Sequence, residues 1–358
     1  MQTRIKKITK ILLSTALASG GILLIVDSAG VTDATRNSVT VCLNVIIPSL
    51  FSFMVFSSIL IDSGCADLIF KPFYFICRPW FKGDLRLFSV FMLSLIGGYP
   101  VGVKLLSSVS AYNKNYNAIM HKILPYCYCG SPSFIIAIVG LQLYGNAKAG
   151  LIVYISNVLA CLSVAIISNI LSKRLVYSSA SDYERGRFSL MPCIIDSIKS
   201  AVYSLSMICG TILLFNIILE LLEFCGVFCC LSDNTNAIVR SFAEITNLSR
   251  LDKNNYSLLP MIAAVCSTGG ACILMQTAVM AQGKIKLKPF LLARIPIAVL
   301  SGVYCFLLQK AFLNDMSAWI SPGGYNFIYS EANPICSICL IFMSYILLKS
   351  TRKNSRLL

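Results

Sequence analysis

The feature that most constrains this chain is the recurrence of long apolar runs separated by short polar connectors. Hydrophobic residues make up 57% of the 358 residues and charged residues only 13%, against about 45–50% and about 25% in soluble globular domains. A water-soluble core of this size could not hide so much apolar surface, so a lipid bilayer must solvate part of it. The sequence therefore predicts an all-α, polytopic integral membrane protein, because helices satisfy their own backbone hydrogen bonds in lipid.

The apolar runs define the expected membrane spans. Run 149–171 is the clearest, because its interior holds no charge and its Leu, Ile and Val side chains favour insertion by several kcal/mol in total. The full set of runs is 11–26, 41–61, 87–111, 123–143, 149–171, 200–222, 257–282, 289–309 and 334–348. We expect about eight full spans, with 87–111 entering and leaving on one face as a re-entrant segment. In the alternative, 87–111 crosses fully, which would place the basic loop 172–187 outside.

Positive charge is concentrated in the polar connectors and at the two ends of the chain. There are 30 Lys and Arg residues against 15 Asp and Glu, a net charge of +15. Such a balance would indicate nucleic-acid binding in a soluble protein, but basic loops between apolar runs follow the positive-inside rule. We therefore expect no nucleic-acid partner, a multi-pass location in the cell membrane, and cytoplasmic N- and C-termini. Connector 311–333, which holds Asp315 and Glu331, is expected outside.

The first 30 residues resemble a signal sequence. Residues 1–10 are basic and residues 11–26 are apolar, but no clear small-x-small cleavage site follows them. We expect an uncleaved signal-anchor helix over 1–30, and a cleaved signal peptide is the alternative.

Two glycine-rich segments interrupt apolar runs: Gly97-Gly98-Tyr99-Pro100 and Ser267-Thr268-Gly269-Gly270. Proline lacks an N–H and disfavours helical geometry at the residue before it, and glycine admits backbone angles closed to other residues. A helix broken in lipid exposes backbone donors and acceptors at several kcal/mol each, so protein, water or a ligand must satisfy them. We predict a loop between half-helices at each segment, with free amides suited to an anionic or polar group. Close helix packing at the glycines is the alternative, above all at Gly269 and Gly270.

The two interrupted segments occupy matching places in two halves of the chain. Segments 38–53 and 197–212 each lead into a span that contains a helix breaker, Pro48 in one and Gly210 in the other. Each is followed by a polar connector and then by a broken segment, and in the topology above the two run in opposite directions. The pattern predicts an inverted repeat whose broken helices mark a binding site near the bilayer midplane.

A few polar side chains near these segments need an explanation. Glu244, beside Thr246 and Asn247, is interpreted as one wall of a polar cavity, although a solvated connector carboxylate is an equal alternative. Gln276 lies in an apolar run, where an unpaired amide is costly, so it faces the bundle interior or bonds a partner helix. Ser131 either joins the site or only starts a helix before a proline. The candidate substrate-binding residues are Gly97, Gly98, Tyr99, Pro100, Ser131, Glu244, Thr246, Asn247, Ser267, Thr268, Gly269, Gly270 and Gln276.

No motif of the chain indicates catalysis or metal binding. A Walker loop, a Gly-x-Ser-x-Gly elbow and a His/Cys/carboxylate cluster are all missing from the sequence. Cys127-Tyr-Cys129 and Cys336-Ser-Ile-Cys339 have the spacing of ligand or redox pairs, but the single histidine, His121, leaves zinc without a full ligand set. We expect no enzyme activity, no catalytic residue, no cofactor and no metal, and the oligomeric state stays open.

Five motifs resemble those of the YlbJ-type sporulation integral membrane proteins of spore-forming Firmicutes. They are Ile47–Phe51 (IPSLF), Leu95–Lys104 (LIGGYPVGVK), Cys129–Ile136 (CGSPSFII) with Val139 and Gly140, Glu244–Asn247 (EITN) and Gly269–Gln276 (GGACILMQ). The resemblance extends over roughly residues 38–310. Proteins of this family carry the nucleoside-recognition or Gate domain, which is similar to part of the concentrative nucleoside transporters.

This resemblance implies a Gate-like membrane protein that is made during sporulation and needed for spore cortex formation. The expected divisions are a signal anchor (1–30), a first Gate-like half (31–171), a cytoplasmic linker (172–190), a second Gate-like half (191–310), and an outer connector with the last span (311–358). We expect the lipid bilayer as a partner and a small polar solute that moves through the site. A non-transporting scaffold for sporulation partners is the alternative.

Overall fold

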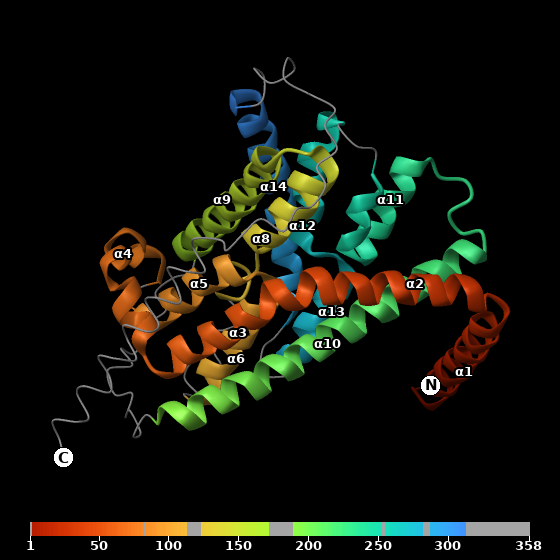
Figure 1. The fold of residues 1–358 in the computed structure, drawn as a ribbon, viewed down its shortest axis with the longest axis horizontal. Helices are drawn as coiled ribbons and strands as arrows, with labels where there is room; N and C mark the ends of the chain where they lie inside the picture. The colour runs from red at the N-terminus through yellow and green to blue at the C-terminus, as the bar shows by residue number, and fades with distance from the viewer. Residues whose placement is uncertain are drawn as a thin grey trace. The chain divides into compact units, whose positions relative to one another are not determined.

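The computed structural model describes residues 2–81, 84–112, 123–171, 189–251, 255–281 and 287–312. These residues form helices joined by turns and short irregular segments, and no strand occurs among them (Figure 1). The all-α class expected from composition is confirmed for this part of the chain.

The helices follow the apolar runs, with interruptions. The first part of the chain contains α1 (Gln2–Val26), α2 (Ser28–Val41), the π-helical turn η1 (Cys42–Ile46), α3 (Ile47–Asp62), α4 (Cys65–Phe81), α5 (Leu85–Gly97) and α6 (Tyr99–Tyr112). The middle contains α8 (Pro132–Ile135), η3 (Ile136–Leu143), α9 (Ala147–Leu171), α10 (Leu190–Phe224) and α11 (Asp233–Ala243). The last part contains η4 (Ile245–Arg250), η5 (Tyr256–Leu258), α12 (Leu259–Thr268), α13 (Gly270–Met280) and α14 (Leu287–Phe312).

Five stretches of the described residues are long and apolar enough to cross a membrane. They are Ser28–Asp62, Ala147–Ser168, Leu190–Phe224, Tyr256–Met280 and Leu287–Phe312. The expected count of about eight spans is not reached among these residues. The runs at 11–26, 87–111 and 123–143 contribute only the shorter apolar helices Lys10–Val26, Leu85–Gly97 and Pro132–Leu143, because breaks interrupt the latter two runs. Run 334–348 lies outside the described residues.

Helix α10 lies along the continuous helix made by α2, η1 and α3, and it runs in the opposite direction (Figure 1). The direction follows from the contacts. Asn216, late in α10, bonds Ser38 early in the partner helix, whereas Ile208 shares a cavity wall with Leu50, which lies further along that helix. Two further helix pairs pack together, α6 with α13 and α9 with α14. These contacts bring the first and second halves of the chain together around the broken segments.

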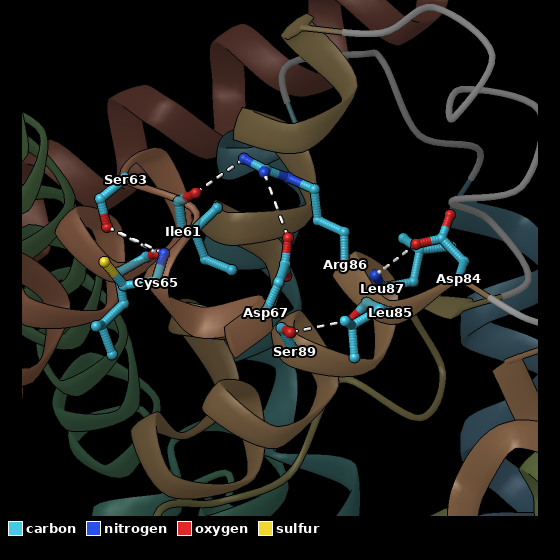
Figure 2. A network of polar contacts seen from close by, with 10 residues as sticks. Ile61, Ser63, Cys65, Asp67, Asp84, Leu85, Arg86, Leu87 and Ser89 are labelled. Atoms are coloured by element: carbon cyan, nitrogen blue, oxygen red, sulfur yellow. Dashed lines mark hydrogen bonds and ion pairs between the residues drawn. The ribbon is translucent and has the colours of Figure 1, made fainter. Parts of the chain in front are cut away.

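A polar network fixes the corner where α3, α4 and α5 meet (Figure 2). Arg86 donates from Nη2 to the carbonyl of Ile61 at 2.9 Å, and its Nη1 lies 3.8 Å from the Asp67 carboxylate. Asp84 accepts from the backbone N–H of Leu87 at 3.0 Å and caps the start of α5. The network therefore sets where α5 starts, and thirteen residues later α5 ends in the interior at Gly97.

Both predicted helix breaks are confirmed. Gly98 separates α5 from α6 with φ 89° and ψ −176°, a conformation that is essentially restricted to glycine. Gly269, with φ 78°, separates α12 from α13, and Gly270, with φ 74°, is the first residue of α13. Close packing accompanies the break at Gly98, because a Cβ added there would lie 2.9 Å from the backbone nitrogen of Ser131.

Replacement of Gly98 by alanine should destabilise the protein. Its backbone conformation costs a residue with a side chain about 1–3 kcal/mol, and the added Cβ would crowd Ser131. We expect a lower melting temperature of the purified protein in detergent, measured by scanning fluorimetry.

The matched control is Gly210→Ala. Gly210 lies inside α10, and no heavy atom stands within 4 Å of an added Cβ. Alanine is favoured over glycine in a helix by about 1 kcal/mol, so this variant should keep or raise the melting temperature. Equal melting temperatures for Gly98→Ala and the wild type would contradict the account of the break.

Candidate functional site

A cavity lies where the two long antiparallel helices meet the first helix break and the segment after α11. It is lined by Ile46, Ser49, Leu50, Gly98, Tyr99, Pro100, Ser131, Phe134, Ile208, Ile212, Glu244, Ile245, Thr246, Ile273 and Gln276. Its volume is about 50 Å³, taken as the space that water centres can occupy, and one water needs about 10–15 Å³ on this measure. The cavity therefore has room for a few waters or a small polar group.

The structure divides the predicted binding residues into two groups. Gly98, Tyr99, Pro100, Ser131, Glu244, Thr246 and Gln276 line the cavity. Gly97, Asn247, Ser267, Thr268, Gly269 and Gly270 do not belong to its lining. The second break thus reaches the cavity only through α13, which contributes Ile273 and Gln276.

Glu244 is the acidic residue of the cavity lining, and it is only 1% exposed. Its Oε1 accepts from the backbone N–H of Thr246 at 3.2 Å, whereas its Oε2 has no hydrogen-bond partner among the described residues. Burial raises the pKa of this carboxyl, which lies outside the candidate spans, and contacts with Cys272 and Thr246 lower it. A thiol is a weak donor, so Cys272 does not replace a full partner. The interpretation of Glu244 as a solvated connector carboxylate is wrong.

A relay of side-chain amides holds the backbone at Glu244. The Ser38 hydroxyl donates to a carbonyl of its own helix, so Ser38 must accept from Asn216 Nδ2 at 2.9 Å. The Asn216 oxygen then accepts from Asn247 Nδ2 at 3.2 Å, and the same Nδ2 donates to the Glu244 carbonyl at 3.0 Å. The network fixes the orientation of both amides. Asn247 therefore positions Glu244 and does not line the cavity.

The Thr211 hydroxyl sets the orientation of the Gln276 amide, because it can only accept a hydrogen bond from it. The Thr211 hydroxyl donates to carbonyls of α10, so it accepts from Gln276 Nε2 at 2.8 Å. The same Nε2 lies 3.3 Å from the Cys272 sulfur. Gln276 is 3% exposed, lines the cavity and makes the interhelical bond considered from the sequence, and no hydrogen bond from a described residue reaches its amide oxygen.

Side chains satisfy the carbonyls left free where α12 ends. A helix leaves its last four carbonyls without an intrahelical partner. Tyr99, from the first break, donates to the carbonyl of Cys266, and Tyr128 donates to the carbonyl of Thr268 at 3.1 Å. The Tyr99 hydroxyl therefore joins the two breaks directly, and Tyr128 ties the segment before α8 to the end of α12.

Arg294 of α14 completes this set of contacts from inside an apolar span, where it is 3% exposed. Its Nη1 donates to the carbonyls of Tyr128 at 3.1 Å and Ser267 at 3.3 Å, and its Nη2 donates to the carbonyl of Pro125. The guanidinium lies 4.7 Å from the Tyr128 ring centre and 5.1 Å from that of Phe290. None of the ion pairs between described residues includes Arg294. Its charge instead holds the irregular segment before α8 against the end of α12.

The sequence analysis overlooked Arg294, Tyr128, Thr211 and Asn216. One signal was available, because Arg294 interrupts the apolar run 289–309 and an ionisable residue within a span usually has a specific partner. Asn216 gave a similar signal, because its amide lies in the apolar run 200–222. Thr211 gave none, and its partner Gln276 is 65 residues away in the sequence.

The chain is similar to a curated protein, the sporulation integral membrane protein YlbJ of Bacillus subtilis (strain 168). The two are 23% identical over 341 residues, which cover 84% of this chain and 82% of that protein. No protein-family model matches the chain, and no solved structure matches it. Together with the apolar helices, this similarity supports a multi-pass protein embedded in the membrane.

Removal of the Tyr128 hydroxyl should weaken the contact between the segment before α8 and the end of α12. Tyr128→Phe leaves the Thr268 carbonyl without its side-chain donor, and an unsatisfied buried polar group costs about 1–3 kcal/mol. We expect a lower melting temperature than that of the wild type. Tyr203→Phe is the control, because Tyr203 is 62% exposed on α10, and it should leave the melting temperature unchanged. If both variants have the melting temperature of the wild type, the hydrogen bond to the Thr268 carbonyl does not stabilise the break.

Proposed function

We propose that this chain is a sporulation membrane protein that binds a small polar solute in the cavity and moves it across the cell membrane. The single observation that carries the binding is the Glu244 carboxylate, which is buried in the cavity wall with one oxygen unpartnered. An unpaired polar group is costly in an apolar environment. Buried ionisable groups that face the interior of a membrane protein commonly mark the path of a solute or an ion. The role in sporulation rests on the name of the relative.

The order of elements supports movement of the solute. In each half a 35-residue helix, Ser28–Asp62 or Leu190–Phe224, is followed by a short helix and then by a helix broken at glycine. The two long helices are antiparallel and pack together. Helices α6 and α13 are also in contact. We therefore propose an inverted repeat, in which one half moves against the other around the cavity. The Gate-like halves 31–171 and 191–310 are part of this proposal.

Opening of the cavity would act on the contacts between the breaks. The Tyr99 side chain lines the cavity and donates to the Cys266 carbonyl at the end of α12. Exchange of this bond for one to water or solute would separate α6 from α12 without leaving a backbone carbonyl unpaired. The present cavity holds only a few waters, so a larger solute requires such a change. We propose that the transported solute is used in the formation of the spore cortex.

A variant that fills the cavity tests transport. Ile208→Trp adds bulk to the cavity wall from α10, and Val202→Trp is the control on the same helix, at a side chain 50% exposed. Uptake into proteoliposomes would be measured for labelled nucleosides and cell-wall precursors. We expect uptake by the wild type and Val202→Trp, and loss of uptake in Ile208→Trp.

The same variants test the role in the cell. Deletion of the gene in its own host should lower the yield of heat-resistant spores and thin the spore cortex in electron micrographs. The wild type and Val202→Trp should restore both, and Ile208→Trp should not. If Ile208→Trp folds, shown by its melting temperature and gel-filtration profile, yet restores sporulation fully, the protein acts as a scaffold and not through the cavity.

A further inference from the structure

The donors and acceptors of the cavity wall are unequally used. The hydroxyls of Ser49 and Tyr99 donate to backbone carbonyls. The Nε2 group of Gln276 donates to the Thr211 hydroxyl and to the Cys272 sulfur. The backbone N–H of Thr246 donates to Glu244 Oε1. These groups therefore already use their protons within the protein.

Several N–H groups at the two helix starts that face the cavity already have acceptors. At the start of α6, Pro100 has no N–H and the N–H of Val101 donates to the Gly98 carbonyl. At the start of α8, the N–H of Phe134 donates to Ser131 Oγ, and that of Ile135 to the Ser131 carbonyl. The N–H groups of Val101, Phe134 and Ile135 are therefore not available to an anion.

Acceptors, in contrast, remain available. Glu244 Oε2 has no hydrogen-bond partner among the described residues, and no donor to the Gln276 amide oxygen is found among them. No Lys, Arg or His belongs to the cavity lining, and much of the remainder is Ile, Leu and Phe. Arg240, the buried arginine of the preceding helix, is paired with Glu223 and bonded to Asn236. A carboxylate in such surroundings lacks a counter-charge, and an uncompensated buried charge is strongly unfavourable.

We propose that the cavity binds a small monovalent cation, with the Glu244 carboxylate as its counter-charge and the Gln276 amide oxygen as a neutral ligand. The lining holds one carboxylate, which matches one positive charge, whereas divalent Ca²⁺ takes six to eight oxygens and commonly several carboxylates. The volume of about 50 Å³ fits an alkali-metal ion or a small ammonium ion. This inference deepens the proposed function, because it names the charge of what the same cavity holds, and it does not require that transport occur.

The test is a cation titration of the purified full chain in detergent. The protein is first placed in N-methyl-D-glucamine chloride, whose cation is too large for the cavity. NaCl, KCl, LiCl or methylammonium chloride then replaces it at constant ionic strength while the melting temperature is recorded. A ligand that binds only the folded state raises the melting temperature. We expect a saturable rise with at least one of these cations, and the separate arms distinguish a metal ion from an organic ammonium ion.

Two cavity variants and one surface variant assign the effect to the site. Glu244→Gln should abolish the saturable rise and should melt no lower than the wild type in N-methyl-D-glucamine chloride, because an unpaired buried charge is gone. Gln276→Leu should weaken the apparent affinity at least tenfold. Asp33→Asn removes the same charge at an exposed side chain and should titrate as the wild type does. Equilibrium dialysis with ²²Na⁺ or ⁸⁶Rb⁺ provides a readout independent of folding stability.

The outcomes separate this inference from the proposed function. A rise that is equal for all cations, or that survives in Glu244→Gln, overturns the cation site. If Ile208→Trp blocks solute uptake but the titration finds no cation site, the transport proposal still holds and the cation site is overturned. A saturable cation effect at Glu244, together with no uptake of any solute tested, supports the cation site and contradicts the transport proposal.

Discussion

The need to pair every backbone carbonyl where α12 stops is the constraint on which the interior of this protein depends. Water cannot serve this purpose in the hydrocarbon region, so side chains from distant segments serve it instead. Tyr99, Tyr128 and Arg294 each donate to one of the last carbonyls of α12. Since these side chains come from α6, the segment before α8, and α14, the broken helix draws three parts of the chain together.

This arrangement also explains why the second break does not line the cavity. Its carbonyls are occupied by protein donors, and its glycines are needed for close approach, since a Cβ on Gly269 would collide with the Tyr128 hydroxyl. The first break has a different role. Gly98 and Pro100 face the cavity directly, while Tyr99 both lines the cavity and bonds the end of α12. The two breaks are alike in sequence, but one is part of the cavity wall and the other is an anchoring point.

The interpretation of the cavity depends on hydrogen-bond direction more than on residue type. Gln276 and Asn247 both carry a side-chain amide, but their hydrogen-bond partners give the two residues different roles. Thr211 can only accept from Gln276, which leaves an oxygen for the cavity, whereas Asn247 gives its protons to Asn216 and to the Glu244 carbonyl. The same reasoning identifies Glu244 Oε2 and the Gln276 amide oxygen as acceptors without a donor among the described residues.

The sequence by itself determined the all-α membrane class and the positions of the helix breaks, because hydropathy, proline and glycine act locally. It also allowed Gly98, Tyr99, Pro100, Ser131, Thr246 and Gln276 to be named for the cavity. Only the tertiary structure showed that Asn247 positions Glu244. It also showed that the Ser267 carbonyl accepts from Arg294 and that the Thr268 carbonyl accepts from Tyr128. Each of these roles is set by partners far along the chain, and the direction of a hydrogen bond exists only once both partners are in place.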